Sequence, residues 1–223
     1  ILVGDSMANV LYAHKDTHKI SLENIIQHTL SVKKGVKKSL LVVDMPKGTY
    51  ENPITALKNS KKLMKKTGCD AIKIESNKRN FDIIKKIVSK KIPVMGHIGF
   101  TPQFKKKFSV EGTTRESAKK LLKEALEIEK AGAFSIVLEC ISSEASKLIT
   151  SSLKIPTVGI GSSYNCDGQI LVTDDMLGLS GFYPRFVKKY VDLNRLIEKA
   201  VKKYTRDVKQ KKFPTINNFL YGK

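Results

Sequence analysis

Short apolar runs that end in a carboxylate recur along this chain and constrain its fold more than any other feature. The runs are rich in Val and Ile, and they lack the strict alternation of a strand with one wet face. Such runs are typical of strands buried on both faces, which belong mostly to parallel sheets covered by helices. Four of them, at residues 1–5, 40–44, 71–75 and 134–139, end in Asp5, Asp44, Glu75 and Glu139.

Helical patterns separate the runs and extend the same rhythm over the chain. We expect further strands and intervening helices, the strands at 92–97, 155–161 and 168–172 and the helices at 21–35, 53–66, 81–90, 115–131 and 143–153. This alternation indicates βα units joined by right-handed crossovers. It predicts an α/β fold of the (β/α)₈ TIM barrel type, in which the carboxyl ends of all strands open onto one rim.

Two further points bear on the barrel prediction. An open doubly wound sheet is the competing fold, but no GxGxxG motif follows a strand, and the acids are spread over too many strands for one switch point. Seven strands are visible, and the sequence begins inside a strand without an initiator Met. We therefore expect the first strand of the barrel, and the natural N-terminus, to lie upstream of Ile1.

The chain is strongly basic, with a formal net charge of +20 over 223 residues. Such a charge raises nucleic acid or an anionic membrane as a partner. The lysines, however, fall at helical spacing opposite apolar positions, as on a solvated outer face, and no RNA-binding aromatic signature or zinc-finger spacing accompanies them. We interpret residues 1–223 as a single barrel domain with a basic helical segment at about 183–223, and we do not expect a nucleic-acid partner.

Cysteine usage and hydropathy indicate the compartment. The three cysteines form no CxxC pair, so neither a zinc site nor a disulfide framework is indicated. No apolar stretch approaches the roughly 18 residues of a membrane span, and no charged-then-apolar signal segment opens the chain. These features predict a cytoplasmic protein that does not engage a membrane.

Asp5, Asp44 and Glu75 end successive visible strands, so in a barrel they would stand side by side on the rim. Crowded carboxylates are costly unless something neutralises them, and hard oxygen ligands suit Mg²⁺. Mg²⁺ commonly completes its shell with substrate oxygens, such as the keto and carboxylate groups of a 2-oxo acid. The sequence therefore predicts a magnesium site; a loop hydrogen bond or a helix cap is the alternative for each acid.

Three other side chains are candidates on the same rim. Lys73 precedes Glu75 by two and so shares its face of the strand; it suits anion binding, a Schiff base or a structural ion pair. Glu139, across the barrel from the acid cluster, suits a general base that removes a proton next to a polarised carbonyl. His97 lies between two glycines, and it suits either a hydrogen bond to substrate or a structural role.

Taken together, the strand ends resemble the ketopantoate hydroxymethyltransferase family. The likeness covers essentially the whole chain. It rests on six motifs in register: residues 3–6 (VGDS), 44–46 (DMP) with Tyr50 behind them, 73–75 (KIE), 96–103 (GHIGFTPQ), 138–140 (LEC), and 159–161 (GIG) followed by 167–172 (DGQILV).

The resemblance implies a phosphoenolpyruvate/pyruvate superfamily barrel that transfers a hydroxymethyl group from 5,10-methylenetetrahydrofolate to 3-methyl-2-oxobutanoate, on the route to pantothenate. It also implies cytoplasmic homo-oligomers, often decamers. For the residues, it implies Mg²⁺ on Asp5, Asp44 and Glu75, and Glu139 as proton acceptor. The 2-oxo acid would contact Asp5, Ser6, Asp44 and Lys73, and we add His97 to that set.

The sequence departs from the family pattern in loops that cover the site. Ala8-Asn9, His18-Lys19 and Lys47 replace common family residues, and the segment after Gln103 is shorter and carries three lysines. These changes leave the proposed metal and base positions intact but put folate affinity in question. Two other functions stay open: another 2-oxo-acid aldolase or lyase of the same superfamily, and a basic nucleic-acid-binding protein.

Overall fold

A parallel sheet of seven strands forms the centre of the protein. The computed structural model describes residues 1–77, 80–105 and 107–219. The sheet order is the chain order, and each strand pairs in parallel with the next. The strands are β1 (Leu2–Val3), β2 (Val42–Asp44), β3 (Ala71–Glu75), β4 (Val94–Gly99), β5 (Ser135–Glu139), β6 (Thr157–Ile160) and β7 (Gly168–Gln169). This sequential, all-parallel order confirms the barrel-type α/β fold.

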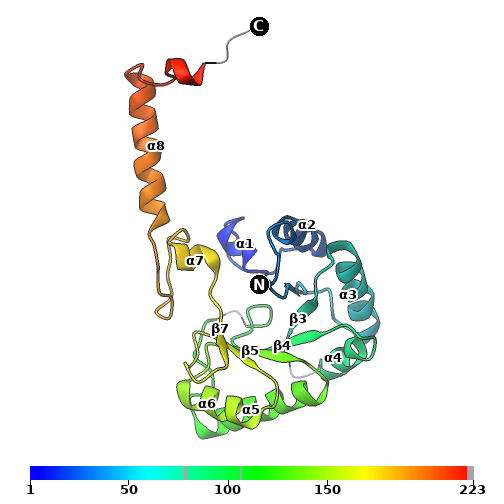
Figure 1. The fold of residues 1–223 in the computed structure, drawn as a ribbon. Helices are drawn as coiled ribbons and strands as arrows, with labels where there is room; N and C mark the ends of the chain where they lie inside the picture. The colour runs from blue at the N-terminus through cyan, green and yellow to red at the C-terminus, as the bar shows by residue number, and fades with distance from the viewer. Residues whose placement is uncertain (78–79, 106, 220–223) are drawn as a thin grey trace. The chain divides into compact units, whose positions relative to one another are not determined.

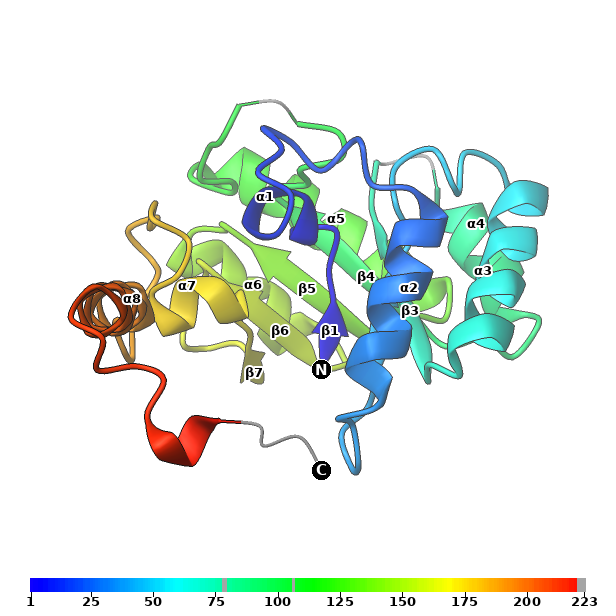
Figure 2. The same ribbon diagram turned by 90° about the horizontal axis from the view of Figure 1, so that it is seen from above.

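Helices follow the strands and lie along the outside of the curled sheet (Figure 1 and, seen from above, Figure 2). The main ones are α2 (Leu22–Lys33), α3 (Pro53–Thr67), α4 (Phe81–Val88), α5 (Arg115–Lys130) and α6 (Ser143–Ser152). Side chains cap the N-termini of α2, α3, α5 and α6 by accepting from the first free backbone N–H groups. The Ser21 hydroxyl accepts from the Asn24 amide at the start of α2, and the Asn52 side chain does the same for α3. A short α1 (Met7–Val10), which the sequence patterns did not predict, follows β1.

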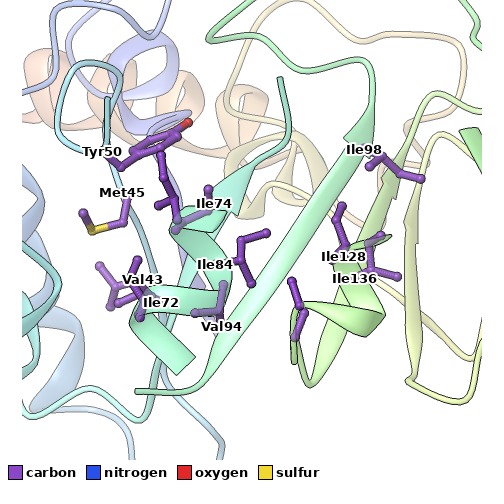
Figure 3. Packing of buried hydrophobic residues seen from close by; sticks show 14 of the residues in the cluster. Val43, Met45, Tyr50, Ile72, Ile74, Ile84, Val94, Ile98, Ile128 and Ile136 are labelled. Atoms are coloured by element: carbon purple, nitrogen blue, oxygen red, sulfur yellow. The ribbon is translucent and has the colours of Figure 1, made fainter. Parts of the chain in front are cut away.

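The outer face of the sheet packs against these helices, and the inner face carries the candidate site residues. Side chains alternate across a strand, so Ile72 and Ile74 point to the helix layer, where they belong to one cluster with Ile84 of α4 (Figure 3). All three are fully buried. Each such side chain contributes roughly 1.5–3 kcal/mol to folding. The outer face of the sheet therefore holds the main core.

The inner face is apolar at one end and polar at the other. Its apolar layer consists of Val42, Ala71, Met95 and Val137, which form a separate buried cluster. Further toward the carboxyl ends of these strands, the side chains on the same face are charged or polar. We call these residues the polar layer: Asp44, Lys73, Glu75, His97 and Glu139.

Residues Leu171–Lys223 form a second compact unit, distinct from Ile1–Ile170. Its described part contains α7 (Thr173–Leu177), α8 (Leu193–Lys209) and a 3₁₀ turn (Ile216–Asn218). Helix was expected from residue 183, but α8 begins only at Leu193, because the Asp192 side chain caps it by accepting from the Arg195 amide. None of the described helices is long and apolar enough to cross a membrane.

Replacing Gly99 by alanine is expected to destabilise the protein by about 3 kcal/mol or more, since it combines overpacking with left-handed strain. Gly99 ends β4 with φ of +98°, and an added Cβ would lie 2.1 Å from the Glu139 carbonyl oxygen. Gly68 is the control: its φ is +62° with open space around the new Cβ, so alanine there should cost only about 1 kcal/mol. Equal losses in urea unfolding would contradict this reading.

Candidate active site

The acids that end β1 and β2 meet at the rim of the inner face. The Asp5 backbone amide donates to Asp44 Oδ2 at 3.0 Å, and both residues are buried. Gly4 lies against both groups: a Cβ added to it would be 3.1 Å from Ser6 Oγ and 3.4 Å from Asp44 Oδ2. Ser6 is therefore close to the acid pair. The glycine thus leaves room for the hydroxyl and the carboxylate to face the same space.

Burial and like charge perturb Asp5. The pKa of its carboxyl is raised from 3.8 to about 7, first by burial and then by the neighbouring Asp44 carboxylate. The pKa of Glu75 is also raised, chiefly by burial, with Asp5 and Asp44 adding to the effect. Because both carboxyl groups resist ionisation, their surroundings favour an added positive charge.

Lys73 supplies part of that charge. Its Nζ lies 2.5 Å from Asp44 Oδ1, as the β2–β3 register, which pairs these residues, requires. Burial alone lowers the pKa of the Lys73 ammonium, but Asp44, Glu75 and Asp5 outweigh it and raise the pKa above its usual value. Lys73 is therefore held charged. Of the three roles open to it, the ion pair with Asp44 is present, anion binding stays a prediction, and the held charge disfavours a free amine for a Schiff base.

His97 links the acids of β3 and β5. Its Nδ1 lies 3.3 Å from Lys73 Nζ and its Nε2 lies 3.1 Å from Glu139 Oε2. Burial first, and then Lys73, lower the pKa of the imidazole, so the ring is neutral. A neutral ring that accepts from the ammonium at Nδ1 carries its proton on Nε2. The Nε2 proton therefore lies next to the Glu139 carboxylate, with 3.1 Å between Nε2 and Oε2, in a contact that lacks the geometry of a hydrogen bond.

Glu139 stands nearer to the acid cluster than the sequence suggested. It was expected across the barrel, but one imidazole ring separates it from Glu75, whose Oε1 lies 3.7 Å from His97 Nδ1. The Glu139 side chain is 20% exposed, whereas those of His97 and Glu75 are almost inaccessible. The Glu139 carboxylate is thus the more accessible of these groups.

Gln103 was not assigned a role from the sequence, although it ends one of the six motifs. It is fully buried, and its side-chain amide donates to Asp5 Oδ2 at 2.9 Å. Its backbone N–H donates to Glu75 Oε2 at 3.0 Å. Tyr50, also quoted without a role, donates to Gln103 Oε1 at 2.5 Å. Their one sequence signal was membership of a motif behind a strand end.

The donors predicted to bind Mg²⁺ fit its chemistry, although they are not preassembled around it. Within residues 1–77, 80–105 and 107–219, no group of three or more His, Cys, Asp or Glu side chains is placed so that it could hold a metal ion. Asp44 pairs with Lys73 instead, and Glu75 accepts from Gln103. The buried oxygen donors and the raised pKa of Asp5 nonetheless suit a hard cation.

The raised pKa of Asp5 predicts how stability depends on pH in protein stripped of divalent cations. Folded Asp5 keeps its proton to about pH 7, whereas the unfolded chain releases it near 3.8. Its stabilising contribution is thus complete below pH 3.8 and is lost as pH rises through 7. Asp5→Asn, which is always neutral, should exceed the wild type in stability at pH 8 by up to about 4 kcal/mol.

Urea unfolding with EDTA at pH 5 and pH 8 checks this prediction. The advantage of Asp5→Asn should be smaller at pH 5, where most of the folded wild type is still protonated at this position. If Asp5→Asn is less stable than the wild type at pH 8, the ionised Asp5 carboxylate does not destabilise the folded protein, and the prediction is wrong.

Comparison with known proteins gives the family. Residues 1–216 match the family model described as ketopantoate hydroxymethyltransferase. The 3-methyl-2-oxobutanoate hydroxymethyltransferase of Pelagibacter ubique is 49% identical over 96% of this chain and 84% of its own length. That of Clostridioides difficile is 44% identical over 96% of this chain and 80% of its own length.

Solved structures with the same fold are more distant in sequence. A 2,3-dimethylmalate lyase, a PEP mutase/isocitrate lyase superfamily member, matches with a TM-score of 0.55 and 16% identity over 98% of this chain and 77% of its own. An oxaloacetate acetylhydrolase matches with a TM-score of 0.55 and 13% identity over 98% and 76%. The fold is thus similar to that of these proteins, and by its sequence the chain belongs to the ketopantoate hydroxymethyltransferase family.

Proposed function

We propose that the protein transfers a hydroxymethyl group from 5,10-methylenetetrahydrofolate to 3-methyl-2-oxobutanoate, forming 2-dehydropantoate for pantothenate biosynthesis. Family membership supports the reaction. The observation that carries the mechanism is the polar layer itself: Lys73 and His97 join the Asp5–Asp44 pair to Glu139 through contacts of 2.5 to 3.3 Å. These contacts support the proposal that the four acids act in one site.

Glu139 is the proposed proton acceptor. The C3–H bond of the 2-oxo acid breaks, its proton goes to the carboxylate, and the electron pair forms the enolate. His97 Nε2 lies 3.1 Å from one carboxylate oxygen, Oε2, and the other oxygen is proposed to face C3. The enolate carbon then bonds to the methylene carbon of the folate, whose two C–N bonds break, and water supplies the hydroxyl group. The proton taken from C3 and one proton of the water go to the two freed nitrogens, and tetrahydrofolate leaves.

Asp5, Asp44 and Glu75 are the proposed holders of Mg²⁺. These residues would place the ion against the 2-oxo group, where its charge would make the C3 proton more acidic. Asp5, Ser6, Asp44, Lys73 and His97 are proposed to bind the 2-oxo acid. The Lys73 ammonium contributes fixed positive charge that favours an anionic substrate.

The natural state is proposed to be a cytoplasmic homo-oligomer. Helix α8 supports association, because it exposes a row of large apolar side chains at helical spacing: Ile197, Val201, Tyr204 and Val208. Unburied apolar rows of this kind mark interaction surfaces. The three cysteines are unpaired, in keeping with a reducing compartment.

Mass spectrometry of the product formed from 3-methyl-2-oxobutanoate, methylenetetrahydrofolate and Mg²⁺ tests the proposal. We expect 2-dehydropantoate, with formation that requires the folate. Consumption of 2-oxo acids that ignores folate would favour an aldolase or lyase of the same fold. Absence of turnover with salt-sensitive binding to nucleic acid would favour a basic binding protein instead.

A further inference from the structure

Gln103 stands at the junction of the segments that form the site. It lies on the segment after β4 and is fully buried. Its backbone N–H and its side-chain amide together make four hydrogen bonds. The partners are Glu75 Oε2 at 3.0 Å, Asp5 Oδ2 at 2.9 Å, the Met45 carbonyl at 3.0 Å and the Tyr50 hydroxyl at 2.5 Å.

The orientation of the Gln103 amide is fixed by these partners. A phenol that stays protonated donates its proton, and burial raises the pKa of Tyr50 far above its usual value. Gln103 Oε1 is therefore the acceptor for Tyr50, which turns Nε2 toward Asp5 and the Met45 carbonyl. Both of the latter are acceptors, so the reversed amide would face oxygen with oxygen.

We propose that Gln103 is a positioning residue: it holds the carboxylates of Asp5 and Glu75, from β1 and β3, in one arrangement, and Tyr50 holds Gln103. This inference rests on the proposed function, in which these acids bind a divalent cation and the 2-oxo acid. Gln103 itself touches neither. Groups that orient ligand carboxylates typically change metal affinity by about 10- to 100-fold when removed.

A purely structural role for Gln103 predicts a different outcome. Loss of a buried polar group would then lower stability wherever it occurs, without any particular effect on the acids. Thr29 offers the matched control, because it is also fully buried and its hydroxyl donates to the Ile25 carbonyl at 2.6 Å within α2. Thr29→Val removes a comparable hydrogen bond outside the polar layer.

The test compares Gln103→Leu, Tyr50→Phe and Thr29→Val with the wild type by Mn²⁺ binding, followed by electron paramagnetic resonance in the presence of 3-methyl-2-oxobutanoate. We expect the dissociation constant of Mn²⁺ to rise about 10- to 100-fold in Gln103→Leu and on the order of threefold in Tyr50→Phe. Thr29→Val should bind as the wild type does. Circular dichroism establishes that each variant is folded.

Several results would overturn the inference. Wild-type affinity in folded Gln103→Leu, or the same weakening in Thr29→Val, would do so, as would a wild type that binds no Mn²⁺. If Gln103→Leu does not fold, unchanged affinity in Tyr50→Phe decides against the proposal. Failure of the wild type to form 2-dehydropantoate would refute the proposed reaction, whereas the Mn²⁺ affinities decide the positioning role.

Discussion

Glu139→Gln is expected to lower the rate of 2-dehydropantoate formation by about 10²- to 10⁴-fold, the range found when a general base is lost. Glutamine has the same shape and fits the same contact with His97 Nε2, which lies 3.1 Å from Glu139 Oε2. The variant should therefore fold and bind the 2-oxo acid. What it lacks is an oxygen basic enough to take the C3 proton.

Exchange of the C3 hydrogen in deuterated water isolates this step. In the wild type, with the divalent ion but without folate, the 2-oxo acid should exchange at C3, and Glu139→Gln should not support that exchange. Glu124→Gln is the control, since Glu124 is a buried carboxylate on α5 that accepts from Ser76 Oγ, outside the polar layer. Wild-type exchange in Glu139→Gln would refute its role as base.

The fold followed from the sequence because parallel strands buried on both faces carry a strong local signal. The strand at 71–75 has the predicted bounds, since an apolar run between a helix-ending Gly68 and a polar segment has few other solutions. The bounds failed in the tail, where residues 183–192 precede the capped start of α8. In that basic, mixed sequence only Asp192 indicates where the helix begins, and its capping role depends on the local backbone path.

The convergence of the candidate acids was also predictable, but their contacts were not. Parity along a strand put Lys73 and Glu75 on one face, and parallel register then placed Asp44 beside Lys73. Gln103 lies in a loop, where no periodicity sets direction, and it reaches Asp5 across 98 positions. Such a bond depends on the loop's path in three dimensions, which no local pattern encodes.

Lys73→Met is expected to lower the free energy of unfolding by about 3–5 kcal/mol, the usual cost of removing one partner of a buried ion pair. The methionine chain replaces the packing volume but leaves Asp44, which is 2% exposed, without its cation. His97 Nδ1 loses its donor as well. Lys120→Met is the control, because its pair with Glu116 on α5 is exposed and should contribute little to stability.

A second substitution separates the lost charge pair from lost packing. If the destabilisation comes from an uncompensated carboxylate, Asp44→Asn should recover part of it in the Lys73→Met background, although Asp44→Asn alone should destabilise the wild type. Urea unfolding of the four proteins gives the coupling between the two sites. If the two substitutions change the free energy of unfolding additively, Lys73 stabilises the protein through packing. The charge of Lys73 would then not stabilise the buried Asp44 carboxylate.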